Sequence, residues 1–264
     1  MRPLCRAAVV ALGVAACAAA SDIGGIEFFG YGDLDRAAIR ESLPLREGSP
    51  WLEENREALR NSVKDQVGTD PADMAVTCCD ESGNRWIYIG LGREVGPGIG
   101  FLDAPHGAIR LSEELLLLYE RLEKALIAAV ERGGEAIRED VSRGYALTRD
   151  PAAQAIELQI RDYALTHDAK IFRALRDSSD ARHRAIAAEA AGYAEHSAEQ
   201  VAALCRAVRD SSADVRNNAI RALRVLASSD VELAAPIPAS LFLDLLSSGV
   251  WADRNKSVAV LASR

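Results

Sequence analysis

The chain has 264 residues, of which 49% are hydrophobic and 27% are charged, and its formal net charge is −8 at pH 7. This composition is ordinary for a soluble globular protein of one large domain or two smaller ones. General binders of nucleic acid or anionic membranes neutralise phosphates with clustered lysine and arginine, and no such cluster occurs. The balance of charges therefore argues against both of these classes.

The first 20 residues have the pattern of a secretory signal peptide. Arg2 and Arg6 precede an apolar run over residues 7–20 that contains no charged side chain. That run is shorter than the ~20 apolar residues that span a bilayer, and small residues precede Ser21, as signal peptidase requires. We therefore predict that residues 1–20 are a signal peptide and that the protein is exported to the periplasm or the cell envelope. Loss of the two arginines would change the net charge to −10.

A second kind of export signal overlaps the first. Residues 14–17, Val-Ala-Ala-Cys, resemble a bacterial lipobox, in which Cys17 would become the lipidated first residue. One acyl chain holds a protein to a membrane only weakly, so stable anchoring would need a second signal. Lipidation at Cys17 and cleavage before Ser21 both stay open. A membrane is expected as a partner only through such an anchor or through an envelope protein.

A mixed α/β segment is predicted over residues 24–92, because 14 of the 19 glycines precede residue 108. Helix caps, prolines and alternating apolar residues mark its elements. These are a strand over 26–29, a helix from Asp33 or Asp35 to Leu43, a helix from Ser49-Pro50 to Gly68, and strands over 74–79 and 85–91. The turn 80–84 joins the last two strands as a hairpin, so the predicted order is β-α-α-β-β.

Two stretches of this segment resemble POTRA domains, the periplasmic modules of outer-membrane assembly and secretion proteins. They are residues 26–30, Ile-Glu-Phe-Phe-Gly, and residues 39–48, which contain Leu-Pro-Leu-Arg-Glu-Gly. The resemblance implies a role in cell-envelope assembly or secretion and an exposed strand edge that accepts an extended peptide. A single copy occurs here, and a plain α+β spacer stays open as the alternative.

Residues 93–111 are rich in glycine and proline and are predicted to be a linker. Asp103 and His106 lie in it, but two polar residues without further partners do not predict a metal site. Ser112 then begins a helix as its N-cap. A stripe of apolar residues predicts its buried face. The stripe comprises Leu115, Leu118, Leu122, Leu126 and Val130, and further helices are predicted over 136–147, 151–165 and 169–176.

An internal repeat dominates the C-terminal part of the chain. Residues 173–179 recur at 206–212, and a third unit begins near Leu241. Residues 215–223, Val-Arg-Asn-Asn-Ala-Ile-Arg-Ala-Leu, resemble the core of HEAT repeats. The resemblance covers residues 170–264 well and 112–169 only as generic helical pairs. It implies that residues 112–264 form an all-α, HEAT-like solenoid with a concave, protein-binding surface.

Charged residues recur at fixed places in the predicted units. They are Asp177, Arg184, Asp210, Arg216 and Arg254. The two aspartates are expected to cap the next helix, and Arg184 and Arg216 to pair with them in the same or the adjacent unit, as a ladder. Apolar residues in the last predicted turn, Val258 to Leu261, require a cover. Either the array belongs to a longer one, or a partner covers its end.

The sequence contains no pattern of a known catalytic, metal or phosphate site. We therefore expect a non-catalytic scaffold without a cofactor, which binds another protein and no nucleic acid. The predicted binding surface consists of exposed residues of the second helices, Arg182, Asn217, Asn218, Arg221 and Lys256. Two enzymatic alternatives stay open. One is a lyase-like activity in a pocket near Cys205, His183 or Tyr193, and the other is a thiol function of Cys78 and Cys79.

Overall fold

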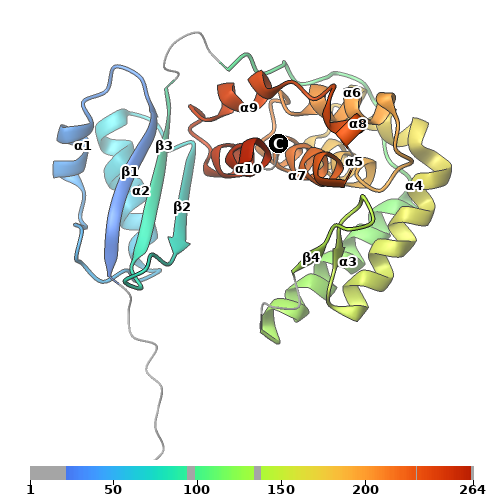
Figure 1. Ribbon diagram of the computed structural model, residues 1–264. Helices are drawn as coiled ribbons and strands as arrows, with labels where there is room; N and C mark the ends of the chain where they lie inside the picture. The colour runs from blue at the N-terminus through green and yellow to red at the C-terminus, as the bar shows by residue number, and fades with distance from the viewer. Residues whose placement is uncertain (1–21, 94–98, 134–137, 230, 263–264) are drawn as a thin grey trace, which may run out of the picture.

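The computed structural model describes residues 22–93, 99–133, 138–229 and 231–262. The predicted signal peptide and Cys17 lie outside these residues. A small N-terminal sheet with two helices is followed by a mostly helical region, and together they form an arch (Figure 1). The sheet lies at one end of the arch, and α3 and α4 lie at the other.

The N-terminal part has the predicted order of elements. They are β1 (Ile23–Tyr31), α1 (Arg36–Ser42), α2 (Asn55–Val67), β2 (Asp73–Cys78) and β3 (Arg85–Arg93). The sheet has the order β1-β3-β2, with β1 parallel and β2 antiparallel to the central β3. Apolar side chains of both helices and of the strands make one core under the sheet. Strand β2 is therefore an edge of the sheet.

Local signals place most of these boundaries. Asp35 caps α1 by accepting hydrogen bonds from the amides of Ala37 and Ala38, and Gly68 ends α2 with a left-handed φ of 82°. The prediction that Ser49-Pro50 begins the second helix is wrong. That pair lies beside the start of β1, where the Ser49 carbonyl accepts a hydrogen bond from the Ile23 amide at 2.8 Å, and α2 begins later.

The helical region contains α3 (Glu113–Glu131), α4 (Pro151–Asp177), α5 (Ala181–Ala191), α6 (Ala198–Ala207), α7 (Ala213–Ser229), α8 (Val231–Ala234), α9 (Ala239–Leu245) and α10 (Trp251–Ala262). Helix α4 merges two predicted helices across a kink at His167. The predicted helix over 136–147 is wrong, because residues 139–148 form a short hairpin of β4 (Glu139–Asp140) and β5 (Leu147–Thr148).

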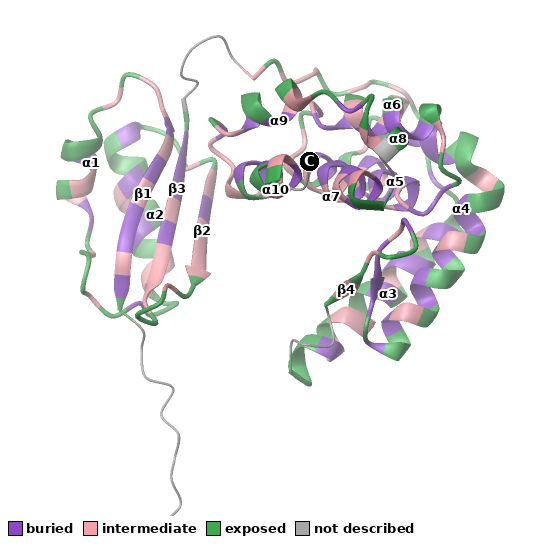
Figure 2. Ribbon diagram, in the orientation of Figure 1, coloured by how far each residue is buried: buried purple, intermediate pink, exposed green. Residues whose placement is uncertain are grey.

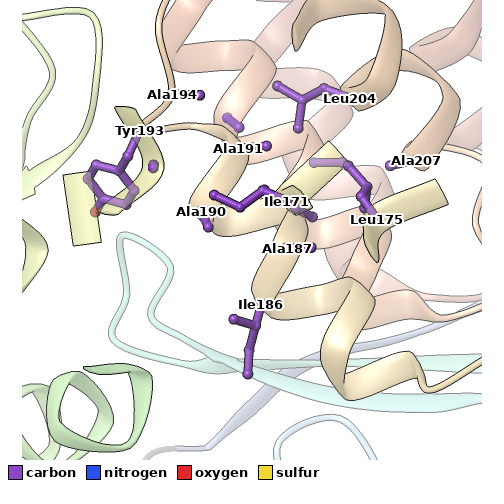
Figure 3. Packing of buried hydrophobic residues seen from close by; sticks show 14 of the residues in the cluster. Ile171, Leu175, Ile186, Ala187, Ala190, Ala191, Tyr193, Ala194, Leu204 and Ala207 are labelled. Atoms are coloured by element: carbon purple, nitrogen blue, oxygen red, sulfur yellow. The ribbon is translucent and has the colours of Figure 1, made fainter. Parts of the chain in front are cut away.

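Small side chains let the helices of this region approach one another closely. Ala187 and Ala190 of α5 and Ala219 of α7 are fully buried, and larger residues such as Ile171 and Leu204 fill the spaces around them (Figure 3). A core of this kind is packed as densely as an organic crystal, so a substitution that adds or removes a methyl group disturbs the packing of its neighbours. Figure 2 shows the buried residues along the inner sides of α4, α5 and α7.

Buried arginines join successive helical pairs. Arg184 donates two hydrogen bonds to Asp210, at 2.8 and 2.9 Å, so it pairs with an acid of the following predicted unit. Arg216 does not pair with Asp177 or with the carboxylate of Asp210. Its partner is Asp253 of the next unit, with a shortest distance of 2.7 Å.

The same arginines hold the turns between helices. Arg184 and Arg216 each donate through Nη1 to a carbonyl six residues upstream, those of Ser178 and Asp210. Arg254 of the third predicted unit donates in the same way to the Ser248 carbonyl. The expected capping by Asp177 is wrong. Asp177 pairs with the neighbouring Arg176 at the surface, and Asp180 caps α5 instead, because Asp177 is still part of α4.

The N-terminal sheet packs on α10, at the end of the helical region. The Trp251 amide donates to Asp73 at 2.7 Å, and the Arg254 guanidinium lies 3.5 Å from the centre of the Phe29 ring. A side chain at Gly90 would collide with the carbonyl of Gly249, so the two segments are in close contact. The chain's own sheet therefore packs on the first turns of α10, whereas Val258, for which we expected a cover from further repeats or a partner, is 55% exposed.

The predicted linker also lies against the helices. The amide of Leu102 donates to the Arg209 carbonyl at 2.7 Å, and the amide of Leu111 donates to Nδ1 of His183 at 2.9 Å. Residues 99–111 thus follow the helical region in an extended conformation, with Asp103 and His106 exposed. Within the described residues, no helix is both long and apolar enough to cross a membrane.

Candidate functional site

A groove of about 660 Å³ lies between α3, α5 and α7. Its wall is largely apolar, with side chains of α3 on one side and of α5 on the other. The α3 side is formed by Leu122, Leu126, Ile127 and Val130, and the α5 side by Ala185 and Ile186. A concave, mostly apolar surface with a few polar groups is the usual form of a binding site.

The apolar wall corrects the predicted buried stripe of α3. Leu115 and Leu122 are buried as expected, but Val130 is 53% exposed and its neighbour Ile127 is 54% exposed. Helices α3 and α4 lie side by side (Figure 1). The last turns of α3 still adjoin the start of α4, since Ala129 is buried and Arg132 pairs with Asp150, but Ile127 and Val130 lie on the side that faces the groove. Two large apolar side chains are therefore open to solvent inside a groove.

Acidic residues border this groove. Glu123, Glu131 and Asp214 line it at the rim, and Glu189 lies deeper. Among the described residues of the lining, Arg182 is the one basic residue, and its guanidinium is 3.5 Å from the carboxylate of Glu120. The groove therefore presents negative charge to whatever enters it.

A polar chamber of about 310 Å³ lies beside the groove. Leu126, Val130, Glu189 and Asn218 line both spaces, so the two adjoin. The other residues of the chamber lining are Glu139, Thr148, Glu157 and Arg221. Residues from α3, α4, α5, α7 and the β4–β5 hairpin thus meet at one place.

Arg221 links two of the chamber's carboxylates. It forms ion pairs with Glu139 and, at 3.4 Å, with Glu189, while Arg224 contacts Glu139 from outside the lining at 3.7 Å. Burial alone would lower the pKa of Arg221, but the negative charges of Glu189 and Glu139 outweigh it and raise that pKa. The guanidinium is therefore permanently charged and already engaged.

Glu157 is the most deeply buried of these carboxyls, with 1% of its surface exposed. It accepts hydrogen bonds from the Thr148 amide at 2.7 Å and from the Thr148 hydroxyl at 3.1 Å. Within the described part of the chain, no cation forms an ion pair with it. Burial raises its pKa, and burial also raises the pKa of Glu189 against the opposing charge of Arg221.

Two tyrosine hydroxyls are buried beside these carboxyls. Tyr119 lines the groove, and Tyr193 lines a small space together with Glu189 and Arg221. Neither hydroxyl has a hydrogen-bond partner of good geometry among the described residues. Burial raises the pKa of both, and the charge of Glu189 adds to this effect at Tyr119. Both are therefore neutral donors near the chamber.

The residues predicted for the binding surface lie in or near this site. Arg182 and Asn218 line the groove, and Arg221 lines the chamber. Burial lowers the pKa of Lys256, and the positive charge of the nearby Arg221 lowers it further. Asn217 is absent from the described linings, and its amide donates to the side chain of Asn218 at 3.0 Å.

The three residues of the lyase-like alternative do not share one pocket in the described structure. His183 holds the Leu111 amide, Cys205 packs partly against the helical core, and Tyr193 lines the small space beside Arg221. Cys78 and Cys79 form a disulfide with each other at the exposed end of β2. No group of three metal-ligating side chains occurs in the residues that the structure describes.

Sequence reasoning missed Glu139, Glu157, Glu189 and Tyr119 as parts of a site. The available signal was an acid on an otherwise apolar helix face. Glu157 follows Ile156 in the buried stripe of α4, and Glu189 interrupts a run of alanines in α5. Such acids are rarely buried unless a partner or a function retains them.

Comparison of the chain with protein-family models, curated proteins and solved structures finds no match. The site is therefore interpreted from its own geometry.

Proposed function

We propose that this chain is an exported, non-catalytic adaptor, in which a POTRA-like module and a HEAT-like solenoid hold a groove for another protein. The Arg184–Asp210 and Arg216–Asp253 pairs between successive units support the solenoid interpretation. So do the buried alanines that recur with the repeat. Repeats of this kind bind partners on their concave side.

The proposal rests on one observation, the pair of exposed apolar side chains inside the groove. Ile127 and Val130 are more than half exposed, although they lie in a concave space that an apolar ligand would fill. Amphipathic helices bind such grooves through residues spaced three and four apart. The acidic rim of Glu123, Glu131 and Asp214 favours a helix whose polar side is basic.

The cellular setting is proposed from the sequence. The signal peptide, or the lipobox ending at Cys17, would bring the protein to the periplasm or the envelope. The POTRA-like module then indicates work in envelope assembly or secretion, with β2 as the strand edge that faces away from β1. The protein would reach a membrane through lipid on Cys17 or through an envelope partner.

An acid–base enzyme is the second candidate function. Strongly perturbed titratable groups in a cleft are common in active sites. Glu157 and Glu189 line the chamber, and Tyr119 lines the adjoining groove. A thiol function of Cys78 and Cys79 would first require reduction of the disulfide that joins them. Turnover that disappears in Glu157→Gln, or in a variant without both cysteines, would favour these functions over binding alone.

The adaptor proposal is tested with a labelled amphipathic helical peptide of leucine and lysine. Fluorescence anisotropy would measure its affinity for the mature protein and for Ile127→Asp, Val130→Asp and Leu117→Asp. Leu117 is the matched control, since it is on the same helix, is 51% exposed and lies outside the described groove lining.

We expect each groove variant to weaken binding about tenfold or more, as for truncation of a central contact, and Leu117→Asp to leave binding unchanged. Equal affinity of all three variants for the peptide would contradict a binding role for the groove.

A further inference from the structure

The polar chamber adjoins the apolar groove, and one of its buried carboxyls, that of Glu157, has no ion pair among the described residues. Three carboxyls, those of Glu139, Glu157 and Glu189, line it with a single guanidinium, that of Arg221. Arg221 already contacts two of them, and Arg224 adds a second positive charge at Glu139. The side of the chamber at Glu157 is left without an ion pair among the described residues.

We propose that this chamber binds an organic cation, an alkylammonium or guanidinium group, carried by a lysine or arginine side chain of the segment that occupies the groove. The inference rests on the proposed function in that it takes the groove as the path of the bound segment. It adds what the proposed function leaves open, namely a basic residue as the specific anchor.

The unpaired hydroxyl of Tyr119 is a second and independent indication of a ligand. The residue is nine-tenths buried, lines the groove and lies near Glu189 and Glu157, yet its hydroxyl has no partner in the described structure. A buried polar group without a hydrogen bond costs about 1–3 kcal/mol, so such groups are usually satisfied by a ligand or water. Tyr119 belongs to the lining of the groove, which adjoins the chamber through Leu126, Val130, Glu189 and Asn218.

The surroundings select an organic cation over other charged ligands. An inorganic or carboxylate anion would be repelled by three carboxyls. A metal ion needs several close ligands, and the described acids are not grouped closely enough to share one. The apolar side chains of Leu126 and Val130 at the entrance instead match the methylene stem of lysine or arginine.

Lys256 and Arg224 do not fill this role. Lys256 is placed near Arg221 and Glu139, and Arg224 contacts Glu139, so both balance the Glu139 side of the cluster. Neither belongs to the lining of the chamber. The incoming cation is therefore expected between Glu157 and Glu189, with the hydroxyls of Tyr119 and Tyr193 nearby.

The test uses two helical leucine/lysine peptides that differ only at one central position, which is lysine in one and norleucine in the other. Their affinities would be measured for the mature protein and for Glu157→Gln and Glu189→Gln. Glutamine keeps the size of the side chain and an oxygen for the Thr148 hydrogen bonds. Glu123→Gln is the control, because it removes an acid of the groove rim outside the chamber.

We expect the lysine peptide to bind about tenfold more tightly than the norleucine peptide, and Glu157→Gln or Glu189→Gln to remove most of that difference. Glu123→Gln should lower the affinity for both peptides by the same factor or leave both affinities unchanged. If both peptides bind alike, or if the preference for lysine survives both chamber variants, the chamber proposal is wrong while the adaptor proposal stands.

A second measurement separates a side chain from a free cation. Butylammonium and butylguanidinium would be titrated into the labelled protein, with the NMR signal of the Thr148 amide as the probe. A saturable shift that Glu157→Gln abolishes, without binding of either peptide, supports a free organic cation and contradicts the adaptor proposal. No peptide preference and no saturable shift would overturn the cation site altogether.

Discussion

Replacing Arg216 with methionine should destabilise the helical region strongly, because it breaks a buried ion pair. Arg216 donates to both carboxylate oxygens of Asp253, at 2.7 to 3.1 Å, and to the backbone carbonyls of Asp210 and Ser211. Asp253 is fully buried and would keep only the hydroxyl of Ser248. Removing one partner of such a pair costs about 3–5 kcal/mol, a large share of a stability of about 5–15 kcal/mol.

Urea unfolding followed by circular dichroism would measure this loss. Arg176→Met is the matched control, since Arg176 forms an ion pair with Asp177 at the exposed surface, where such pairs contribute only about 0–1 kcal/mol. The double variant Arg216→Met/Asp253→Asn should recover about 2 kcal/mol of the loss, because no buried charge is then left unpaired.

A loss below about 1 kcal/mol for Arg216→Met, similar to that of the Arg176 control, would refute the reasoning. It would mean that the pair is not buried between successive helices, and that the ladder does not join the predicted units.

Two further predictions concern the chamber and the sheet. Burial raises the pKa of Glu157 above its ordinary value of 4.5. The stability that the neutral carboxyl contributes is therefore full below pH 4.5 and is lost as the pH rises through the raised pKa. The melting temperature of Glu157→Gln minus that of the unchanged protein should therefore increase from acid to neutral pH. A difference that does not change with pH would count against burial of an ionisable group. Gly90→Val should push the sheet away from the Gly249 carbonyl, lower stability by about 1–3 kcal/mol and change the fluorescence of Trp251. Unaltered stability and emission would show that the sheet does not pack there.

Much of the N-terminal fold could be predicted from local sequence signals. Asp35, Gly68 and the turn at 80–84 act within a few residues of themselves, so their effects are visible without the rest of the chain. Ser49-Pro50 has the same local signature as a helix start, but pairing with the beginning of β1 takes precedence over it. Tertiary pairing of this kind cannot be seen in a window of neighbouring residues.

The partners of the arginines show where the repeat was informative and where it was not. The repeat predicted that Arg184 pairs with an acid of the same or the adjacent unit, and its partner is Asp210 of the adjacent unit. It did not predict Asp253 for Arg216, because the third unit places its acid at the start of α10 and not in the turn before it. Irregular spacing in the third unit concealed the correspondence.

The candidate site could be predicted only in part. The expected exposure of the second helices indicated Arg182, Asn218 and Arg221. Arg182 is exposed as expected, but Asn218 and Arg221 are half-buried. Glu139 and Glu157 come from a hairpin and a helix outside the clear repeats, and 82 residues separate Glu139 from Arg221. Their convergence depends on how α4 and the hairpin pack beside α5 and α7, which a repeat pattern does not encode.

Methyl NMR of the mature protein with the leucine/lysine peptide tests the central claim most directly. We predict saturable shifts of the methyl signals of Leu126, Ile127 and Val130, which line the groove, and none at Leu117. Shifts confined to Val76 and Met74 on the edge strand β2, with the groove signals unchanged, would show that the sheet edge and not the groove binds the segment.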